Sequence, residues 1–184
     1  MESVELLDPE LSRWTIENSS RQNFNFRDGV LEVREPEGWL KSVERYADFE
    51  LAVEFRFMTE DADSGIFVRA LGEREFVRGW PNQSYQVQLR NPLGQSPFPP
   101  VGGLFRHGMA SGETDYDEDL ARRTSLATGE WQTIAVRVEG TRLTASLNGV
   151  PILRAEDIGN GTGFIGLQGE TGSLEFRSIR IRTL

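Results

Sequence analysis

The sequence contains no cysteine, which excludes disulfides, thiolate chemistry and cysteine-based zinc sites. No apolar run approaches the roughly 20 residues that a membrane-spanning helix needs. The net charge of −9 argues against binding to nucleic acid or to an anionic membrane surface, since either would need a basic patch. P-loop, G-x-G-x-x-G, H-E-x-x-H and Ser-His-Asp signatures are also missing. The function therefore has to be sought outside the classes that these signatures mark.

The length of 184 residues suits a single domain, which we place at residues 1–184. Residues 1–5 carry acidic side chains where a secretory signal would carry positive charge and then an apolar run. The chain as written is therefore predicted to be cytoplasmic, or a mature protein whose leader has been removed. Nineteen glycines and eight prolines without repeats favour a turn-rich β protein over a helical bundle.

Apolar residues alternate with polar ones along several short segments, which predicts half-buried β-strands. The clearest is 49–57, where five apolar residues at odd positions fall on one face and Glu50, Glu54 and Arg56 fall on the other. The same period of two occurs at 66–69, 85–90, 133–138 and 143–147. A helix would spread these apolar residues around its whole circumference.

Residues that are typical of turns separate the predicted strands. Asp28-Gly29 and Asn148-Gly149 tolerate positive φ and predict tight hairpins. A β-bulge around Arg177-Ser178 would restore the facing of the last strand. The four prolines of 91–100 predict a loop, and 110–127 predicts a second loop with about one helical turn. We expect an all-β fold, a two-sheet antiparallel β-sandwich or jelly roll.

If the strands at 49–57, 66–69 and 85–90 lie in one sheet, their outward side chains form a polar face. That face would contain Glu50, Glu54, Arg56, Phe67, Arg69, Gln86 and Gln88. Sugars have hydroxyl rims and weakly apolar ring faces, so a sugar site needs planar hydrogen-bonding groups and rings to stack on. Trp39 and Trp80, each beside a glycine, could edge such a groove. Cross-strand ion pairs on a solvated face are the alternative interpretation.

Three further features bear on chemistry. His107 is the only histidine and the one side chain that titrates near neutral pH without perturbation, although a lone histidine beside glycines is more often an exposed loop residue. Lys41 is the only lysine. The acidic run 113–119 lacks the residues of a calcium-binding EF-hand loop, so we interpret it as a solvated loop. No motif supports a metal or other cofactor, and a divalent cation stays a weak alternative.

The order of these segments resembles the 3-keto-disaccharide hydrolase domain family of the concanavalin A-like lectin/glucanase superfamily. The matching stretches cover nearly the whole chain, and each is weak alone while the series is specific. They include Gly38-Trp39-Leu40-Lys41-Ser42, Ser64-Gly65-Ile66-Phe67-Val68-Arg69, Tyr85-Gln86-Val87-Gln88-Leu89, Gly166-Leu167-Gln168 and Glu175-Phe176-Arg177-Ser178. The resemblance implies a concanavalin A-like jelly roll with a sugar site on its concave face.

The resemblance also implies an enzyme that cleaves glycosides already oxidised at C3. A ketone at C3 acidifies the C2 proton, so a base can remove it, the C1 substituent leaves, and water adds to the enone. On this hypothesis Glu54 is the base and Arg69 stabilises the enolate. Gln88 and Gln168 hold sugar hydroxyls, and Lys41 and His107 are candidate acids. Trp39, Trp80 and Gln86 complete the predicted sugar contacts.

The chain departs from the family where Gln86 and Asn91 stand, since relatives carry an acid at the first position and often an aspartate at the second. Many relatives also look periplasmic or secreted. A non-catalytic, lectin-like carbohydrate-binding module is therefore the main alternative function, and a sandwich that docks a protein partner is a third. The predicted partner is a carbohydrate in the first two cases. The sequence leaves the sugar and the linkage open.

Overall fold

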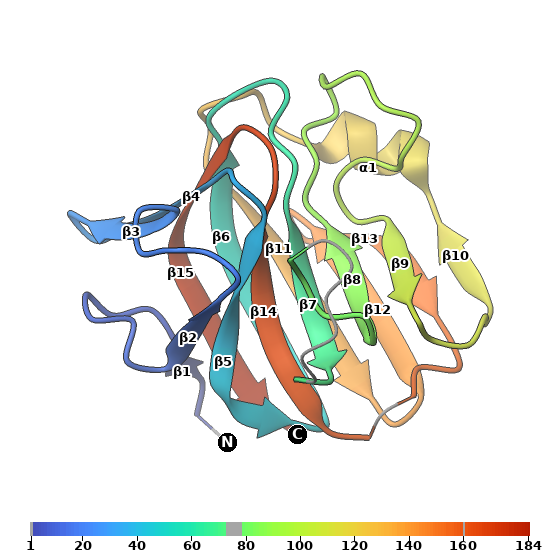
Figure 1. Ribbon diagram of the computed structural model, residues 1–184. Coiled ribbons are helices and arrows are strands. Elements are labelled where there is room, and N and C mark those ends of the chain that lie inside the picture. The colour runs from blue at the N-terminus through green and yellow to red at the C-terminus, as the bar shows by residue number, and fades with distance from the viewer. Residues whose placement is uncertain (1, 73–78, 160) are drawn as a thin grey trace.

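Two antiparallel β-sheets pack face to face in the computed structural model, which describes residues 2–72, 79–159 and 161–184 (Figure 1). The first sheet has nine strands among the described residues. In spatial order they are β10 (Thr114–Tyr116), β13 (Val150–Ala155), β12 (Arg142–Leu147), β11 (Gln132–Glu139), β6 (Phe49–Phe57), β15 (Ser173–Thr183), β4 (Val30–Arg34) and β3 (Phe24–Arg27), with β1 (Val4–Glu5) beside β15.

The second sheet has six strands in the part of the chain that the structure describes, and it faces the viewer in Figure 1. Their order is β2 (Trp14–Glu17), β5 (Gly38–Tyr46), β14 (Gly163–Gly169), β7 (Gly65–Ala70), β8 (Ser84–Gln88) and β9 (Leu104–His107). A single short helix within the described residues, α1 (Glu118–Thr124), lies near β13. The predicted all-β two-sheet sandwich is thereby confirmed.

The core lies between the sheets and consists of the inward side chains of both. β6 alternates as predicted: its five odd-numbered apolar residues are at most 1% exposed, while Glu50, Ala52, Glu54 and Arg56 are not buried. The Phe55 ring meets that of Phe57 edge-on, with ring centroids 5.3 Å apart. Each fully buried aliphatic or aromatic side chain contributes roughly 1.5–3 kcal/mol of transfer free energy, so this strand anchors the nine-stranded sheet.

The predicted turns also form. Asp28-Gly29 joins β3 to β4, and Asn148-Gly149 joins β12 to β13, with positive φ at all four residues. The pairing of β15 with β6 shifts register between Phe176 and Ser178, where the sequence predicted a bulge. Residues 91–100 form no strand or helix, as predicted, and α1 lies inside the second predicted loop. That second segment is not wholly a loop, because β10 forms within it and pairs with β13.

One expectation about the sheets is wrong. β6 and β7 follow one another in the chain, yet β6 pairs with β11 and β15, while β7 pairs with β8 and β14. The outward residues of β6 therefore lie on the opposite side of the molecule from those of β7 and β8. The single polar face predicted from these three strands does not exist. β7 and β8 are also buried on both sides, so their outer face is covered by other side chains.

No helix among the described residues has the length and apolar character needed to cross a membrane.

Candidate functional site

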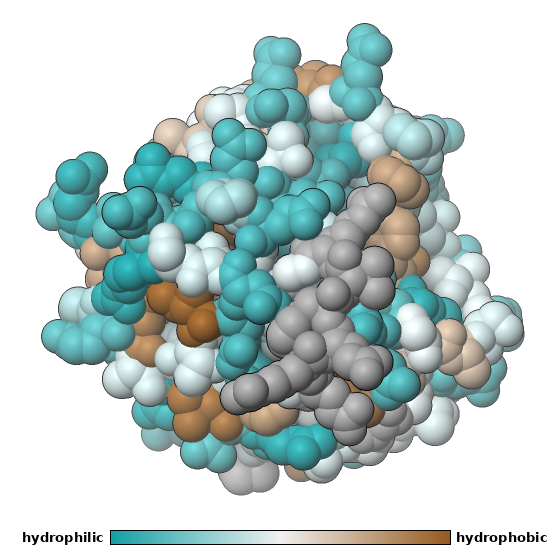
Figure 2. Space-filling view, in the orientation of Figure 1, coloured by the Kyte–Doolittle hydropathy of each residue, from teal (hydrophilic) through white to brown (hydrophobic). Residues whose placement is uncertain are grey.

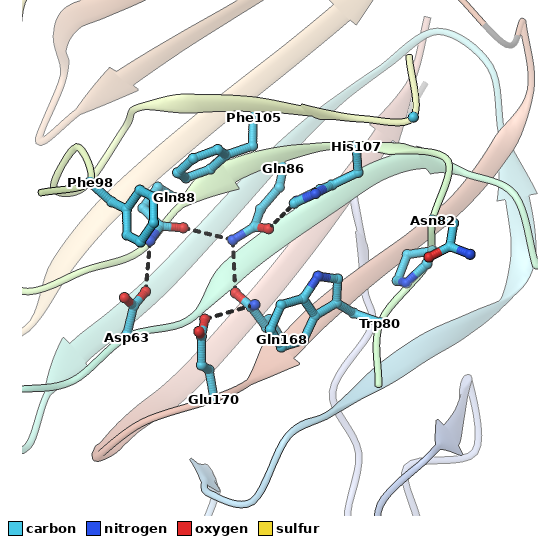
Figure 3. Close-up of a pocket in the computed structure, with 12 residues that line it drawn as sticks. Asp63, Trp80, Asn82, Gln86, Gln88, Phe98, Phe105, His107, Gln168 and Glu170 are labelled. Atoms are coloured by element: carbon cyan, nitrogen blue, oxygen red, sulfur yellow. Dashed lines mark hydrogen bonds between the residues drawn. The ribbon is translucent and has the colours of Figure 1, made fainter. Parts of the chain in front are cut away.

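A pocket of about 370 Å³ opens on the outer face of the six-stranded sheet (Figure 3). This volume lies within the range of small-molecule sites. Its walls come from β8, β9, the end of β14, the segment just before β7, and two loops. The lining residues are Asp63, Trp80, Pro81, Asn82, Gln86, Gln88, Phe98, Phe105, His107, Gly108, Gln168 and Glu170.

A glycine makes room for the central polar side chain of this pocket. An added Cβ at Gly65 would lie 2.3 Å from Nε2 of Gln86, closer than any real contact. Because β7 has no side chain at this position, Gln86 can extend from β8 across β7 and reach Gln168 on β14. Gly65 therefore allows the side chains of Gln86 and Gln168 to meet on the outer face of the sheet.

Three glutamines form a continuous hydrogen-bond network in the floor of the pocket (Figure 3). Gln86 Nε2 donates to Oε1 of Gln88 at 2.6 Å and to Oε1 of Gln168 at 2.7 Å. Gln88 Nε2 donates to Asp63 Oδ1 at 2.7 Å, and Gln168 Nε2 donates to Glu170 Oε2 at 2.9 Å. All three glutamines are at most 3% exposed, so these bonds satisfy amides that burial would otherwise penalise.

Two carboxylates end this network at the same side of the pocket. The Asp63 backbone pairs with that of Thr171 just after β14, which brings the Asp63 side chain near Glu170. Burial, and then the charge of Glu170, raise the pKa of Asp63 to about 7, against the opposing effects of Arg90 and of hydrogen bonds from Ser64 and Gln88. This carboxyl group therefore exchanges a proton near neutral pH.

His107 closes the other end of the network. Its Nε2 lies 2.6 Å from Oε1 of Gln86. The Phe105 ring stacks on the imidazole at 5.9 Å between centroids, and Phe67 meets it edge-on at 6.1 Å. Burial lowers the pKa of His107 below its usual value of 6.5, so the ring is neutral at pH 7 and above.

Aromatic side chains form the apolar wall of the pocket. Phe98, on the proline-rich loop, is 54% exposed and meets Phe105 edge-on at 6.0 Å. Trp80 lies across the pocket from these rings in Figure 3 and is 8% exposed. An apolar wall facing a polar floor complements a sugar, because a sugar has an apolar ring face and a rim of hydroxyl groups.

Five of the nine residues predicted for the site meet in this pocket: Trp80, Gln86, Gln88, His107 and Gln168. Trp39 does not. It is paired with Gln168 across β5 and β14 and is fully buried, with its ring edge-on to Phe67 at 5.7 Å. Gly166 leaves room for it, since an added Cβ there would lie 2.4 Å from the indole. The expectation that Trp39 edges a groove is wrong, because the indole packs into a small buried cluster with Phe67, Ala70 and Trp80.

The predicted pair of Glu54 and Arg69 does not share a pocket, and this expectation is also wrong. Glu54 lies on the outer face of the nine-stranded sheet, where its Oε2 pairs with Arg177 Nε at 2.5 Å. Arg69 is 2% exposed and reaches toward the end of the sandwich. Its φ of +48° breaks the strand alternation, so the side chain leaves the sheet face on which the period of two had placed it.

Lys41 and Asn91 also lie outside the lining of the pocket. Lys41 Nζ pairs with Glu17 at 2.6 Å and lies over the Phe164 ring. The buried Asn91 amide donates to the Thr59 carbonyl at 3.0 Å and to Thr128 Oγ1 at 2.9 Å. The amide at position 91 therefore holds two loops together, and the Lys41 ammonium is paired outside the pocket rather than placed in its lining.

Sequence reasoning missed the remaining lining residues, among them the two carboxylates Asp63 and Glu170 and the two rings of Phe98 and Phe105. One signal for Glu170 was present, because it stands two residues after Gln168 and thus on the same side of the extended chain. Asp63 directly precedes the Ser64-Gly65 segment, but only the pairing with Thr171 brings it to Glu170.

The acidic run 113–119 lies outside the pocket lining. Within it, Asp117 caps α1 by accepting a hydrogen bond from Leu120 N, and Glu118 forms an ion pair with Arg122.

Across residues 2–72, 79–159 and 161–184, no three histidine, cysteine or carboxylate side chains lie close enough together to hold a metal ion.

Figure 2 shows the pocket side of the molecule. Hydrophilic side chains cover most of its visible described surface, and hydrophobic residues form separate spots. The visible described residues thus do not form the broad apolar patch that a protein-docking face would present.

The family of 3-keto-alpha-glucoside-1,2-lyase-like domains matches the chain over residues 2–182. Among solved structures, a candidate glycosyl hydrolase from Parabacteroides distasonis superposes with a TM-score of 0.76 at 20% identity, covering 100% of both chains. A Bacillus subtilis protein of unknown function with a galectin-like fold gives 0.67 at 14% identity, covering 99% of this chain and 94% of that one.

Carbohydrate binding module CBM66 from Bacillus subtilis gives a TM-score of 0.60 at 12% identity, covering 91% of this chain and 93% of that one. At such identities the likeness establishes a galectin-like, concanavalin A-like sandwich fold. No curated protein sequence matches the chain significantly.

Proposed function

The chain belongs to the family of 3-keto-alpha-glucoside-1,2-lyase-like domains, and from this premise we propose that its pocket binds a 3-keto-glycoside and cleaves it by elimination. The fold is that of glycosyl hydrolase-like and lectin-like carbohydrate-binding proteins. The observation that carries the proposal is the carboxyl pair of Asp63 and Glu170 beside three amides, with the Asp63 pKa raised to about 7.

The proposed reaction starts with proton transfer from carbon. The C3 ketone acidifies the C2–H bond, and ionised Asp63 takes this proton while the electron pair forms an enolate. The enolate then expels the C1 substituent, whose oxygen takes the C1–O bonding pair and a proton. Asp63 then carries the proton taken from C2 and is the candidate donor, because C1 and C2 are adjacent and one carboxyl group can serve both atoms. Water adds OH at C1 and H at C2 of the enone, which gives the free 3-keto sugar.

The amides supply the polar contacts in this proposal. Gln88 and Gln168 each donate one amide hydrogen to a carboxylate, and each NH₂ group carries a second hydrogen. These hydrogens can stabilise the enolate oxygen or bind sugar hydroxyls. A general base contributes about 10²–10⁴-fold to such a reaction, and a preorganised donor contributes a comparable factor.

The test is incubation of the full chain with a 3-keto-glucoside, with released aglycone and free 3-keto sugar measured over time. We expect release by the wild-type chain and a loss of about 10²–10⁴-fold in Asp63→Asn. Equal release by the wild type and Asp63→Asn would overturn the assignment of Asp63. No release by the wild type would overturn the proposed reaction.

A carbohydrate-binding module without chemistry is the second candidate. It is favoured by the predominance of amides in the floor of the pocket, since amides bind hydroxyls without transferring protons at neutral pH. In that case calorimetry detects binding of a glucoside to the wild-type chain and to Asp63→Asn alike, with no bond cleavage in either.

A further inference from the structure

The two carboxylates at the end of the pocket's hydrogen-bond network determine which group donates and which accepts in each of its bonds. An ionised carboxylate can only accept hydrogen bonds. Gln88 must therefore turn its NH₂ group toward Asp63, and Gln168 must turn its own toward Glu170, as the contacts at 2.7 and 2.9 Å show. Each of these two glutamines is then left with its amide oxygen facing Gln86.

The orientation of the Gln86 amide in turn determines which group of the His107 imidazole can bond to it. Its NH₂ group has two hydrogens, and both are used, one on the amide oxygen of Gln88 and one on that of Gln168. Its own oxygen is left facing His107 Nε2 at 2.6 Å. An amide oxygen has no hydrogen to give, so the bond forms only if His107 Nε2 carries the proton and donates.

The ring has little freedom to avoid this arrangement. Phe105 stacks on one side of it and Phe67 meets it edge-on. A 180° turn of the imidazole would place a carbon where Nε2 lies and leave the buried oxygen of Gln86 without a donor, which is unfavourable. The ring is also neutral, because burial lowers its pKa. A neutral imidazole protonated at Nε2 has a bare lone pair at Nδ1.

We propose that Gln86 is a positioning residue that holds His107 in the Nε2–H tautomer, so that Nδ1 is the acceptor the pocket offers to a hydroxyl group of the sugar. No hydrogen bond to Nδ1 occurs among the described residues. The acceptor role toward a sugar rests on the proposed function, while the tautomer does not. In this arrangement His107 binds a hydroxyl hydrogen and is not the acid that protonates the leaving group.

The tautomer can be read directly, because His107 is the only histidine in the chain. A histidine-¹⁵N-labelled chain without a polyhistidine tag gives a single imidazole in a long-range ¹H–¹⁵N spectrum. We expect Nε2 at the shift of a protonated nitrogen and Nδ1 at that of an unprotonated one at pH 7.5, with a slowly exchanging Nε2 proton. A protonated Nδ1, or two nitrogens at averaged shifts, would overturn the proposal without any variant.

Two variants and a control assign the effect to Gln86. Gln86→Met removes the acceptor, so the Nε2 proton should exchange fast and the two nitrogen shifts should move toward an average. Gln86→Glu places a carboxylate next to the ring, so the imidazole pKa should rise above its wild-type value. Gln22→Met, at an exposed glutamine outside the pocket, should leave the imidazole spectrum unchanged. A wild-type spectrum in Gln86→Met would contradict the positioning role.

A ligand titration separates this inference from the proposed reaction. A 3-keto-glucoside analogue linked at C1 through carbon, which cannot lose its C1 substituent as an alkoxide, is added to the labelled wild-type chain at concentrations that saturate the backbone shifts of the pocket residues. We expect Nδ1 to move toward the shift of a hydrogen-bonded acceptor while Nε2 stays protonated. An unmoved Nδ1 in the saturated complex would contradict the acceptor role. Turnover of the wild type, measured separately, decides the proposed reaction.

Discussion

Arg69 and Asp48 meet at the end of the sandwich, with Nη2 of the guanidinium 2.8 Å from Oδ1 of the carboxylate. The same guanidinium donates to the carbonyl oxygens of Ala47, Gly140 and Ile158. These groups come from the β5–β6 turn, the β11–β12 turn and the segment before β14. Arg69 therefore joins the two sheets where their connecting turns meet, which is a structural role.

We predict that Arg69→Met lowers the free energy of unfolding by about 3 kcal/mol, because it leaves buried carbonyl groups without a donor. Asp48→Asn should cost about 1 kcal/mol, because Asp48 is partly exposed and the amide can still accept from Gly140 N. Urea unfolding measures both. An Arg69→Met chain with wild-type stability and no turnover would instead place Arg69 in the reaction.

A second prediction concerns Asp63 and stability. Its folded-state pKa of about 7 lies above the unfolded value of 3.8, so the folded state holds this proton more tightly. The contribution of this group to stability is then greatest at low pH and is lost as the pH rises from about 4 to about 7. Relative to Asp63→Asn, the wild type should lose about 2–3 kcal/mol between pH 5 and pH 8.

Denaturant unfolding of both proteins at the two pH values gives this difference, and titrating groups that do not interact with Asp63 cancel in it. The variant should be the more stable protein at pH 8. A difference that does not change between pH 5 and pH 8 would show that Asp63 has an ordinary pKa in the folded chain.

A third prediction concerns the pH profile of turnover. If ionised Asp63 is the base, kcat/KM on a 3-keto-glucoside should rise with pH and level off above an apparent pKa of about 7. The charge of Glu170 contributes to this raised value, so Glu170→Gln should move the rise to lower pH. An unmoved profile in Glu170→Gln would exclude electrostatic coupling between the two carboxyl groups.

A fourth prediction concerns the aromatic wall. Phe98 is 54% exposed, so Phe98→Ala should leave the unfolding free energy within about 0.5 kcal/mol of the wild type. Loss of a stacking surface should weaken binding of a ligand with an apolar group about tenfold, seen as a higher KM or Kd. Leu93→Ala, a matched change at another exposed apolar residue of the same loop, should alter neither quantity.

A fifth prediction tests the two residues that the structure places away from the pocket. Glu54→Gln and Lys41→Met should keep wild-type turnover, since neither side chain lines the pocket. Loss of the partly exposed ion pair with Arg177 should cost at most about 1 kcal/mol. A fall of tenfold or more in kcat for Glu54→Gln, at unchanged stability, would contradict the placement of the active pocket.

The hairpins, the bulge and the facing of β6 could all be predicted because each depends on neighbours in the chain. Asn148-Gly149 adopts positive φ wherever a tight turn is required, and the alternation of 49–57 reports which side chains avoid water. Two of the three glutamines in the pocket floor were accessible in the same way, since Gln86 and Gln88 share one strand face. Asp63 was not, because it joins the site through a backbone pairing with Thr171, which is remote in sequence.

The amino-acid sequence alone determined that this chain forms a two-sheet antiparallel sandwich and that Gln86 and Gln88 share one face of a strand. A period of two is a local property, so it assigns side chains to the faces of a strand. It does not assign strands to sheets, because that depends on pairing between distant segments. Tertiary structure decided that β6 lies opposite β7, that the left-handed backbone at Arg69 turns its side chain away from the pocket, and that Asp63 lies beside Glu170.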